Sequence, residues 1–318
     1  MTFLQLKGAA VALALSVSPF VAHAQDWEPS GPIKMSIAFQ AGGGVDTLGR
    51  LLAEELSARN GWEIIPENAA GKGGGVMAAA MVGEPNDGLS IGVTVDEAMT
   101  YGVQAARNPG YALDDFTYIS TITGTQMAVI AQADRGWTTL GDVIAAAQAG
   151  ESITFAAMSP MLTDAIYIIG KNNDVEFTPV SVQGGKGGLN AVVAEDVDIA
   201  FAAGVQTPGV LAGDLVNLVS GEEGPLRISP DAPMMSDFNV PYIFGSKFIV
   251  VAPAGMPEDI RVTYENAIAE ILNDPESKVA EFASRAFSGP IVVQGEELEA
   301  SVQDLYESYS ALLEDTAE

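Results

Sequence analysis

The sequence predicts an α/β protein of two similar lobes, each with a mainly parallel sheet flanked by helices. Three observations support this prediction. Short apolar runs alternate with helix-like segments, and glycine-rich loops follow two of the first strands. The chain beyond its first 24 residues is also long enough for two domains.

The first 24 residues have the pattern of a cleavable secretion signal. Lys7 precedes an apolar run at 9–21, and Ala22-His23-Ala24 is the small-x-small pattern that a signal peptidase accepts. The run is shorter than the ~20 apolar residues that a spanning helix needs. We therefore expect an exported, soluble protein, cleaved after Ala24.

Composition then excludes several kinds of chemistry. His23 is the only histidine, and the chain has no cysteine. The cleaved protein would thus lack histidine bases, thiol nucleophiles, structural zinc sites and disulfides. Loss of Lys7 would change the net charge from −28 to −29, which disfavours nucleic acid and anionic membranes. We expect a binding protein with no metal, no cofactor and no catalytic residue.

The start of the cleaved chain reads as a βαβαβ unit. Leucines recur at helical spacing in its first helix, and Gly61 ends that helix. The expected strands are 33–39, 63–66 and 89–95, and the expected helices are 46–60 and 76–82.

Further units of the same kind follow. The expected strands are 128–131, 152–157, 178–182, 198–201 and 248–252, and the expected helices are 140–149, 162–171, 188–194, 257–272, 276–287 and 296–314. This order predicts that the chain crosses between lobes and returns. We assign 25–126 and 245–318 to lobe 1, and 127–244 to lobe 2.

Two glycine loops, 41–46 and 71–75, are candidates for an anion site. Each follows a strand and opens a helix. Glycine allows close backbone approach, and a helix N-terminus offers free N–H groups and a partial positive charge. The alternative is that the glycines only make tight turns and that Asp46 only caps its helix.

The second loop also matches a dinucleotide fingerprint, Gly73-x-Gly75-x-x-Ala78, with Asp96 about 20 residues on. Export, the long approach to this loop and the lack of the motif in the first loop argue against that interpretation.

Several motifs together resemble one family. They are Phe39-x-Ala41-Gly42-Gly43-Gly44-x-Asp46, Glu67-Asn68-x-x-Gly71-x-Gly73-Gly74, Pro85-Asn86-Asp87-Gly88, Asn108-Pro109-x-Tyr111, Gly184-Gly185 and Ala252-Pro253-Ala254-Gly255-x-Pro257. The chain resembles the TctC-like or Bug solute receptors of tripartite tricarboxylate transporters. This resemblance implies a type II-like periplasmic-binding fold that closes on a small carboxylate. It also implies a periplasmic location, delivery to membrane permease subunits and a monomer.

The resemblance also places the site. In lobe 1 it implies the residues Phe39, Gly42, Gly43, Gly44, Val45, Asp46, Gly73, Gly74, Gly75 and Thr94. In lobe 2 and the returning segment we expect Ser159, Thr163, Gly184, Gly185, Gln206, Lys247 and Phe248. Lys247 and Lys186 could pair with a second carboxylate. The alternative is that both are surface lysines, which we favour for Lys186.

The second lobe departs from the family pattern at the positions that select the distal part of the ligand. Dicarboxylates, tricarboxylates, acidic amino acids and aromatic acids all stay open. So do two other functions: a sensory receptor that presents its ligand to a kinase or chemoreceptor, and a secreted carboxylate-acting enzyme using Asp, Lys or Tyr as acid and base.

Overall fold

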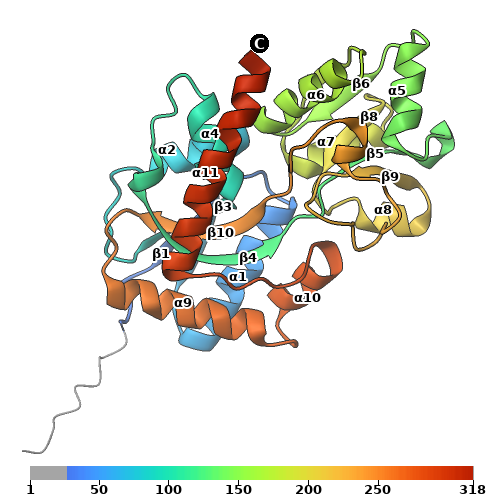
Figure 1. Ribbon diagram of the computed structural model, residues 1–318. Helices are drawn as coiled ribbons and strands as arrows, with labels where there is room; N and C mark the ends of the chain where they lie inside the picture. The colour runs from blue at the N-terminus through green and yellow to red at the C-terminus, as the bar shows by residue number, and fades with distance from the viewer. Residues whose placement is uncertain (1–26, 318) are drawn as a thin grey trace, which may run out of the picture.

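The computed structural model describes residues 27–317 and contains two five-stranded sheets (Figure 1). The predicted secretion signal and its cleavage site fall outside the described residues. None of the helices that are described has the length and hydropathy to cross a membrane.

The first sheet has the order β2-β1-β3-β10-β4. β1, β2 and β3 are parallel, and β10 runs antiparallel to both β3 and β4. Its strands are β1 (Ile33–Ile37), β2 (Ile64–Asn68), β3 (Ser90–Val95), β4 (Phe116–Gly124) and β10 (Lys247–Pro253).

The second sheet has the order β7-β6-β8-β5-β9, again with its fourth strand, β5, antiparallel to both neighbours. Its strands are β5 (Ala128–Gln132), β6 (Thr154–Ala157), β7 (Thr178–Ser181), β8 (Ile199–Ala202) and β9 (Leu215–Ser220). Each sheet is therefore mainly parallel, and the reversed strand is the one that the chain enters after crossing from the other sheet. The predicted two-lobed α/β class is confirmed.

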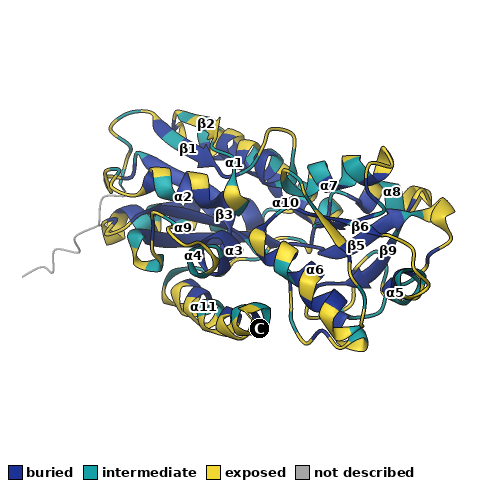
Figure 2. Cartoon of the chain, turned by 90° about the horizontal axis from the view of Figure 1, so that it is seen from above, coloured by how far each residue is buried: buried dark blue, intermediate teal, exposed yellow. Residues whose placement is uncertain are grey.

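Helices cover both faces of each sheet and bury the inner strands, whereas the edge strands β2 and β7 stay largely exposed (Figure 2). On the first sheet, α1 (Gly44–Asn60), α9 (Glu258–Asn273) and α10 (Lys278–Ala286) pack on one face, and α2 (Gly75–Met81) and α3 (Asp96–Met99) on the other. On the second sheet, α5 (Leu140–Gln148) and α6 (Pro160–Asn172) face α7 (Gly184–Val193) and α8 (Thr207–Ala212) across the strands.

The last helix, α11 (Gly295–Ala317), contacts both lobes. Leu298 and Val302 pack with the first sheet's core, whereas Tyr309 and Leu312 pack with the core of the second sheet. The remaining helical segments are α4 (Tyr101–Ala105) and the short 3-10 turns Lys72–Gly74, Leu113–Asp115, Ala133–Arg135 and Met235–Phe238.

The two chain crossings lie side by side between the sheets. The Thr125 N–H donates to the Ser246 carbonyl at 2.8 Å, and the Ser246 N–H donates to Thr125 Oγ1 at 2.9 Å. The Glu222 carboxylate binds the first crossing, because it accepts hydrogen bonds from Thr125 Oγ1 and the Met127 N–H. The two crossings therefore bring polar backbone groups and the Glu222 carboxyl to the space between the lobes.

Candidate functional site

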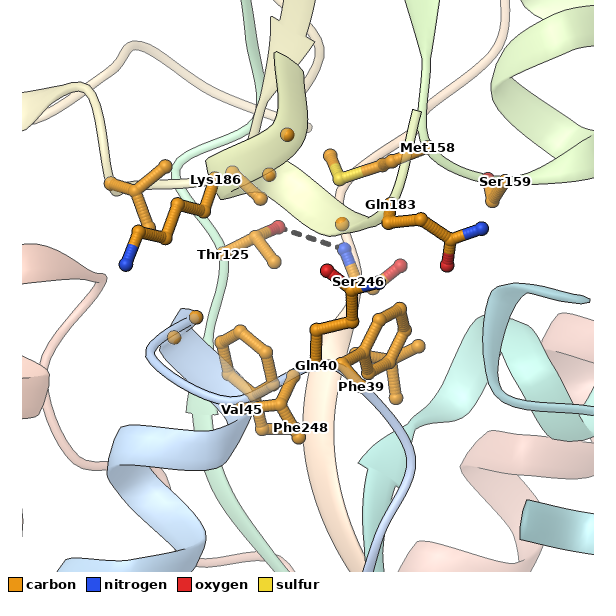
Figure 3. Close-up of a pocket in the computed structure, with 18 of the residues that line it drawn as sticks. Phe39, Gln40, Val45, Thr125, Met158, Ser159, Gln183, Lys186, Ser246 and Phe248 are labelled. Atoms are coloured by element: carbon orange, nitrogen blue, oxygen red, sulfur yellow. Dashed lines mark hydrogen bonds between the residues drawn. The ribbon is translucent and has the colours of Figure 1, made fainter. Parts of the chain in front are cut away.

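A cavity of about 260 Å³ lies between the lobes, at the carboxyl ends of parallel strands from both sheets (Figure 3). Open α/β sheets bind ligands at this edge. Its apolar wall includes Phe39, Val45, Phe248 and Phe287 from the first lobe and Met158 from the second. The polar wall includes Gln40, Glu97, Thr125, Ser159, Gln183, Lys186, Asn190 and Ser246.

Two helix N-termini meet at this cavity from opposite lobes. Gly43 and Gly44 line it where α1 begins, and Gly184 and Gly185 line it where α7 begins. Neither helix has a side-chain cap, so its first N–H groups keep their hydrogen-bonding capacity and partial positive charge. The arrangement favours an anionic group between the two helices.

Lys186 adds a cationic side chain to this anion site. It stands in the first turn of α7, and its Nζ reaches the first glycine loop, since a Cβ built at Gly42 would lie 2.8 Å from it. None of the ion pairs among residues 27–317 involves Lys186. Lys186 is exposed, as expected from the sequence, but it also lines the cavity, so its ammonium is available to a bound anion.

Asp46 holds the first glycine loop in place by hydrogen bonds on the side of the loop away from the cavity. Its carboxylate accepts hydrogen bonds from the Gly42 N–H, Arg50 Nε and Asn68 Nδ2, each at 2.8 Å. Burial alone would raise its pKa, but the bonds from Gly42, Asn68 and Arg50 outweigh burial and hold the pKa of Asp46 below its usual value. The residue is 4% exposed and does not line the cavity, so its role is to fix the loop.

We expect Asp46→Ala to lower the free energy of unfolding by about 2–4 kcal/mol, because it removes the three hydrogen bonds that the buried carboxylate accepts, one of them from a charged guanidinium. Urea unfolding at pH 7 measures the change. Asp304→Ala, which removes an exposed carboxylate from α11, is the matched control and should change stability by less than about 0.5 kcal/mol. Equal stability of the two variants would contradict this role.

Eight of the residues expected from the sequence line the cavity. They are Phe39, Gly43, Gly44, Val45, Ser159, Gly184, Gly185 and Phe248. The other nine are not in its lining: Gly42, Asp46, Gly73, Gly74, Gly75, Thr94, Thr163, Gln206 and Lys247.

The second glycine loop mediates close packing instead of lining the cavity. A Cβ at Gly73 would lie 3.3 Å from Pro160 and 3.4 Å from Ser159, both at the start of α6 in the other lobe. A Cβ at Gly74 would lie 2.8 Å from Ala98. Both glycines have positive φ, so the loop needs glycine for its backbone as well as for these contacts.

Three other residues expected at the site contact neighbouring protein groups instead of the cavity. Gln206 is fully buried and bonds the Gly204 N–H and the Gln126 carbonyl. Thr163 bonds the Ser159 carbonyl within α6. Lys247 lies beside Asp96, and its charge favours ionisation of that carboxyl.

Several lining residues were absent from the sequence expectation, and Glu97 is the most informative. It follows β3 directly, in α3, and is 6% exposed. Burial raises the pKa of Glu97 to about 7, the Ser159 hydroxyl opposes the shift, and the charge of Asp96 adds to it. The sequence did contain a signal for this residue. Asp96 and Glu97 follow an apolar strand directly, at a position that the fold buries, and acidic residues are rarely buried without a partner.

Comparisons with known proteins identify the family. The model of the tripartite tricarboxylate transporter family receptor, TctC, matches residues 48–316. The chain belongs to this family. It is a family of solute receptors and not an enzyme family.

Individual relatives agree along nearly the whole chain. A curated protein of Agrobacterium vitis, encoded in the TAR-I ttuE-ttuC' intergenic region, is 25% identical over 281 residues, covering 84% of this chain and 78% of the relative. The structure of the periplasmic binding protein BugD superposes with a TM-score of 0.80 at 20% identity, covering 91% of this chain and 99% of BugD.

A second similar structure holds a ligand. MatC from Rhodopseudomonas palustris, solved with bound malate, has a TM-score of 0.78 at 22% identity and covers 90% of this TctC-family chain and 99% of MatC. These structural likenesses concern the fold.

Proposed function

We propose that this TctC-family receptor captures a small organic carboxylate between its lobes in the periplasm and delivers it to the membrane subunits of a tripartite tricarboxylate transporter. The observation that carries the proposal is the meeting of the α1 and α7 N-termini, with Lys186 between them, at one interlobe cavity. A carboxylate there would receive backbone N–H donors from both lobes, so its binding would favour closure.

The same proposal includes the lobe boundaries, the location and the stoichiometry. The two crossings between sheets support lobe 1 at 25–126 and 245–318 and lobe 2 at 127–244. Export through the N-terminal signal with cleavage after Ala24 fits the family's periplasmic role, and a single chain forms the whole cavity. MatC, which binds malate, supports the carboxylate class.

Thermal unfolding in the presence of a carboxylate panel tests the function. We expect at least one mono-, di- or tricarboxylic acid at 1 mM to raise Tm, because a ligand that binds only the folded state stabilises it. Neutral sugars of similar size should leave Tm unchanged. No shift with any acid would overturn the proposal.

Lys186→Gln tests the cation at the anion site. We expect the dissociation constant of the best acid from the panel to rise about 5- to 10-fold, because a charged hydrogen bond at an exposed ammonium is worth about 1 kcal/mol. Isothermal titration calorimetry measures it. Lys171 is an exposed lysine on α6 of the same lobe, so Lys171→Gln should bind like the parent protein. Equal affinity of the Lys186→Gln and Lys171→Gln variants would contradict the assignment.

A further inference from the structure

The charged lining of the cavity consists of one cation and one anion. Of the residues that line it, Lys186 and Glu97 alone carry formal charges. Ser159 lies within hydrogen-bonding reach of Glu97, and Figure 3 shows Ser159 and Lys186 on opposite sides of the cavity. The two charges therefore mark different ends of the space that a ligand would fill.

The Glu97 end carries more negative charge than its own carboxylate. Asp96 precedes it and is 5% exposed, and the charge of Asp96 adds to the raised pKa of Glu222 at the crossing. Lys247 lies beside Asp96 and offsets part of this negative charge, but it does not line the cavity. A dianionic ligand would therefore bring a second negative group toward these carboxyls with no cationic side chain in that part of the lining. Such a pairing of like charges in a desolvated site is unfavourable.

Unpartnered polar atoms at the same end also indicate a polar ligand group. Ser246 lines the cavity and is 6% exposed. Its hydroxyl lies close enough to Asp96 to favour ionisation of that carboxyl, but it forms no hydrogen bond of standard geometry among the described residues. Asp96 Oδ1 is likewise buried without a partner there. Buried polar atoms are nearly always paired in folded proteins. A ligand carrying N–H donors would supply partners for both the Ser246 hydroxyl and the Glu97 carboxylate.

We propose that the ligand is an amino carboxylate, whose carboxylate lies between the α1 and α7 N-termini beside Lys186 and whose ammonium lies against Glu97 and Ser246. This inference rests on the proposed function and narrows its ligand class. The ammonium would replace its hydration by a carboxylate and a hydroxyl, which is the pairing that a buried charge requires.

Proton exchange follows from the same arrangement. Burial raises the pKa of Glu97 to about 7, so an ammonium beside it would favour the ionised form and release a proton on binding near pH 7. The titratable groups around Glu97 are Asp96 beside it, Tyr101 on α4, Tyr111, Tyr309 on α11 and, across the cavity, Lys186. Beyond Asp96 lie the cation of Lys247 and the carboxyl of Glu222. Burial raises the pKa values of the three tyrosines, so they stay neutral, whereas Asp96 and Glu222 titrate in the same range as Glu97.

Matched pairs of acids test the ligand class. The probes are L-aspartate against succinate, L-glutamate against glutarate, 4-aminobutyrate against butyrate and 5-aminovalerate against valerate, compared by calorimetry at pH 7.5. We expect at least one amino acid to bind 10-fold or more tightly than its partner without the amine. Titration at pH 7 in two buffers of different ionisation enthalpy should show net proton release for that amino acid.

Glu97→Gln separates the amine contact from the rest of the site. The variant should bring the affinity ratio within each pair to about 1 and abolish proton release, while the acid without the amine binds at least as well as before. Glu63→Gln removes an exposed carboxylate just before β2, outside the cavity lining, and should behave like the parent protein.

The outcomes distinguish the two proposals. If acids without an amine bind as tightly as their amino counterparts, or if Glu97→Gln keeps the ratio, the amino carboxylate assignment fails and carboxylate capture stands. If no acid in either set binds, both fail.

Discussion

Replacing Gly204 by alanine is expected to weaken ligand binding about 10- to 100-fold without unfolding the protein. Gly204 follows β8 in one lobe, and a Cβ there would lie 2.4 Å from the Ala286 carbonyl oxygen and 2.6 Å from Phe287 Cδ1, at the end of α10 in the other lobe. No real Cβ tolerates such a separation from backbone. Overpacking of this kind costs about 1–3 kcal/mol, and the cost applies only when the lobes are together.

The backbone supplies a second cost that must be separated from the first. Gly204 has φ +131°, a conformation that a residue with a side chain rarely adopts, so alanine there is also strained in the separated lobe. Gly213→Ala is the matched control. It has φ +82° in the same lobe, and a Cβ there meets nothing within 4 Å.

Small-angle scattering and calorimetry distinguish these effects. Both variants should lose similar stability, but only Gly204→Ala should lose the ligand-induced decrease in radius of gyration together with its affinity. If Gly204→Ala closes and binds like Gly213→Ala, the contact between Gly204 and Ala286 does not govern closure.

The sequence predicted the elements well where apolar periodicity is strong. The first helix was expected at 46–60 and spans Gly44–Asn60, and the strand expected at 248–252 spans Lys247–Pro253. β4 was not among the expected strands, because Thr and Ser alternate with its apolar residues. All nine of its residues are nevertheless buried. Burial of the polar side chains is tolerated because they find acceptors: Thr121 and Thr123 donate to the carbonyls of Ile291 and Gly289. Those partners lie some 170 residues away in the chain, where no local pattern can show them.

One helix starts earlier than expected, and this start brings an additional residue to the cavity lining. We expected a helix at 188–194, after a stretch that contains Gly184, Gly185 and Gly187. The structure begins α7 at Gly184, which places Lys186 in the first turn and at the cavity. Tertiary packing decides this start. Gly188 approaches the Phe201 carbonyl so closely that a Cβ would lie 2.9 Å from it, so the glycine is needed there for packing against β8.

Lowering the pH from 8 to 5 is expected to stabilise the ligand-free protein by about 3–6 kcal/mol. Burial raises the pKa of Asp96 to about 6 and the pKa values of Glu97 and Glu222 to about 7. A shift of two units corresponds to about 3 kcal/mol for one group. Because the folded state binds more protons than the unfolded chain between these values, the free energy of unfolding falls as the pH rises through this window.

Isosteric amides identify the groups responsible. Glu222→Gln keeps an oxygen that can accept from the Met127 N–H and Thr125 Oγ1, yet it cannot ionise. Urea unfolding at pH 5, 6, 7 and 8 should therefore show a flatter profile for Glu222→Gln and for Glu97→Gln, with the largest gain over the parent protein at pH 8. Asp304→Asn, at an exposed site, should keep the parent slope.

The carboxyls with lowered pKa values affect stability only at more acidic pH, so they do not contribute to the change between pH 5 and pH 8. Burial opposes ionisation of Asp46 and Glu84, but hydrogen bonds and the charges of Arg50 and Lys34 hold both pKa values below normal, so the stability that they contribute is lost only in more acidic solution. Stability that rises from pH 5 to pH 8 would mean that the acids at the cleft floor are solvated or paired in the free protein. It would also remove the reason why an ammonium should bind there, because the cost of an unpaired buried carboxylate is what such a ligand relieves.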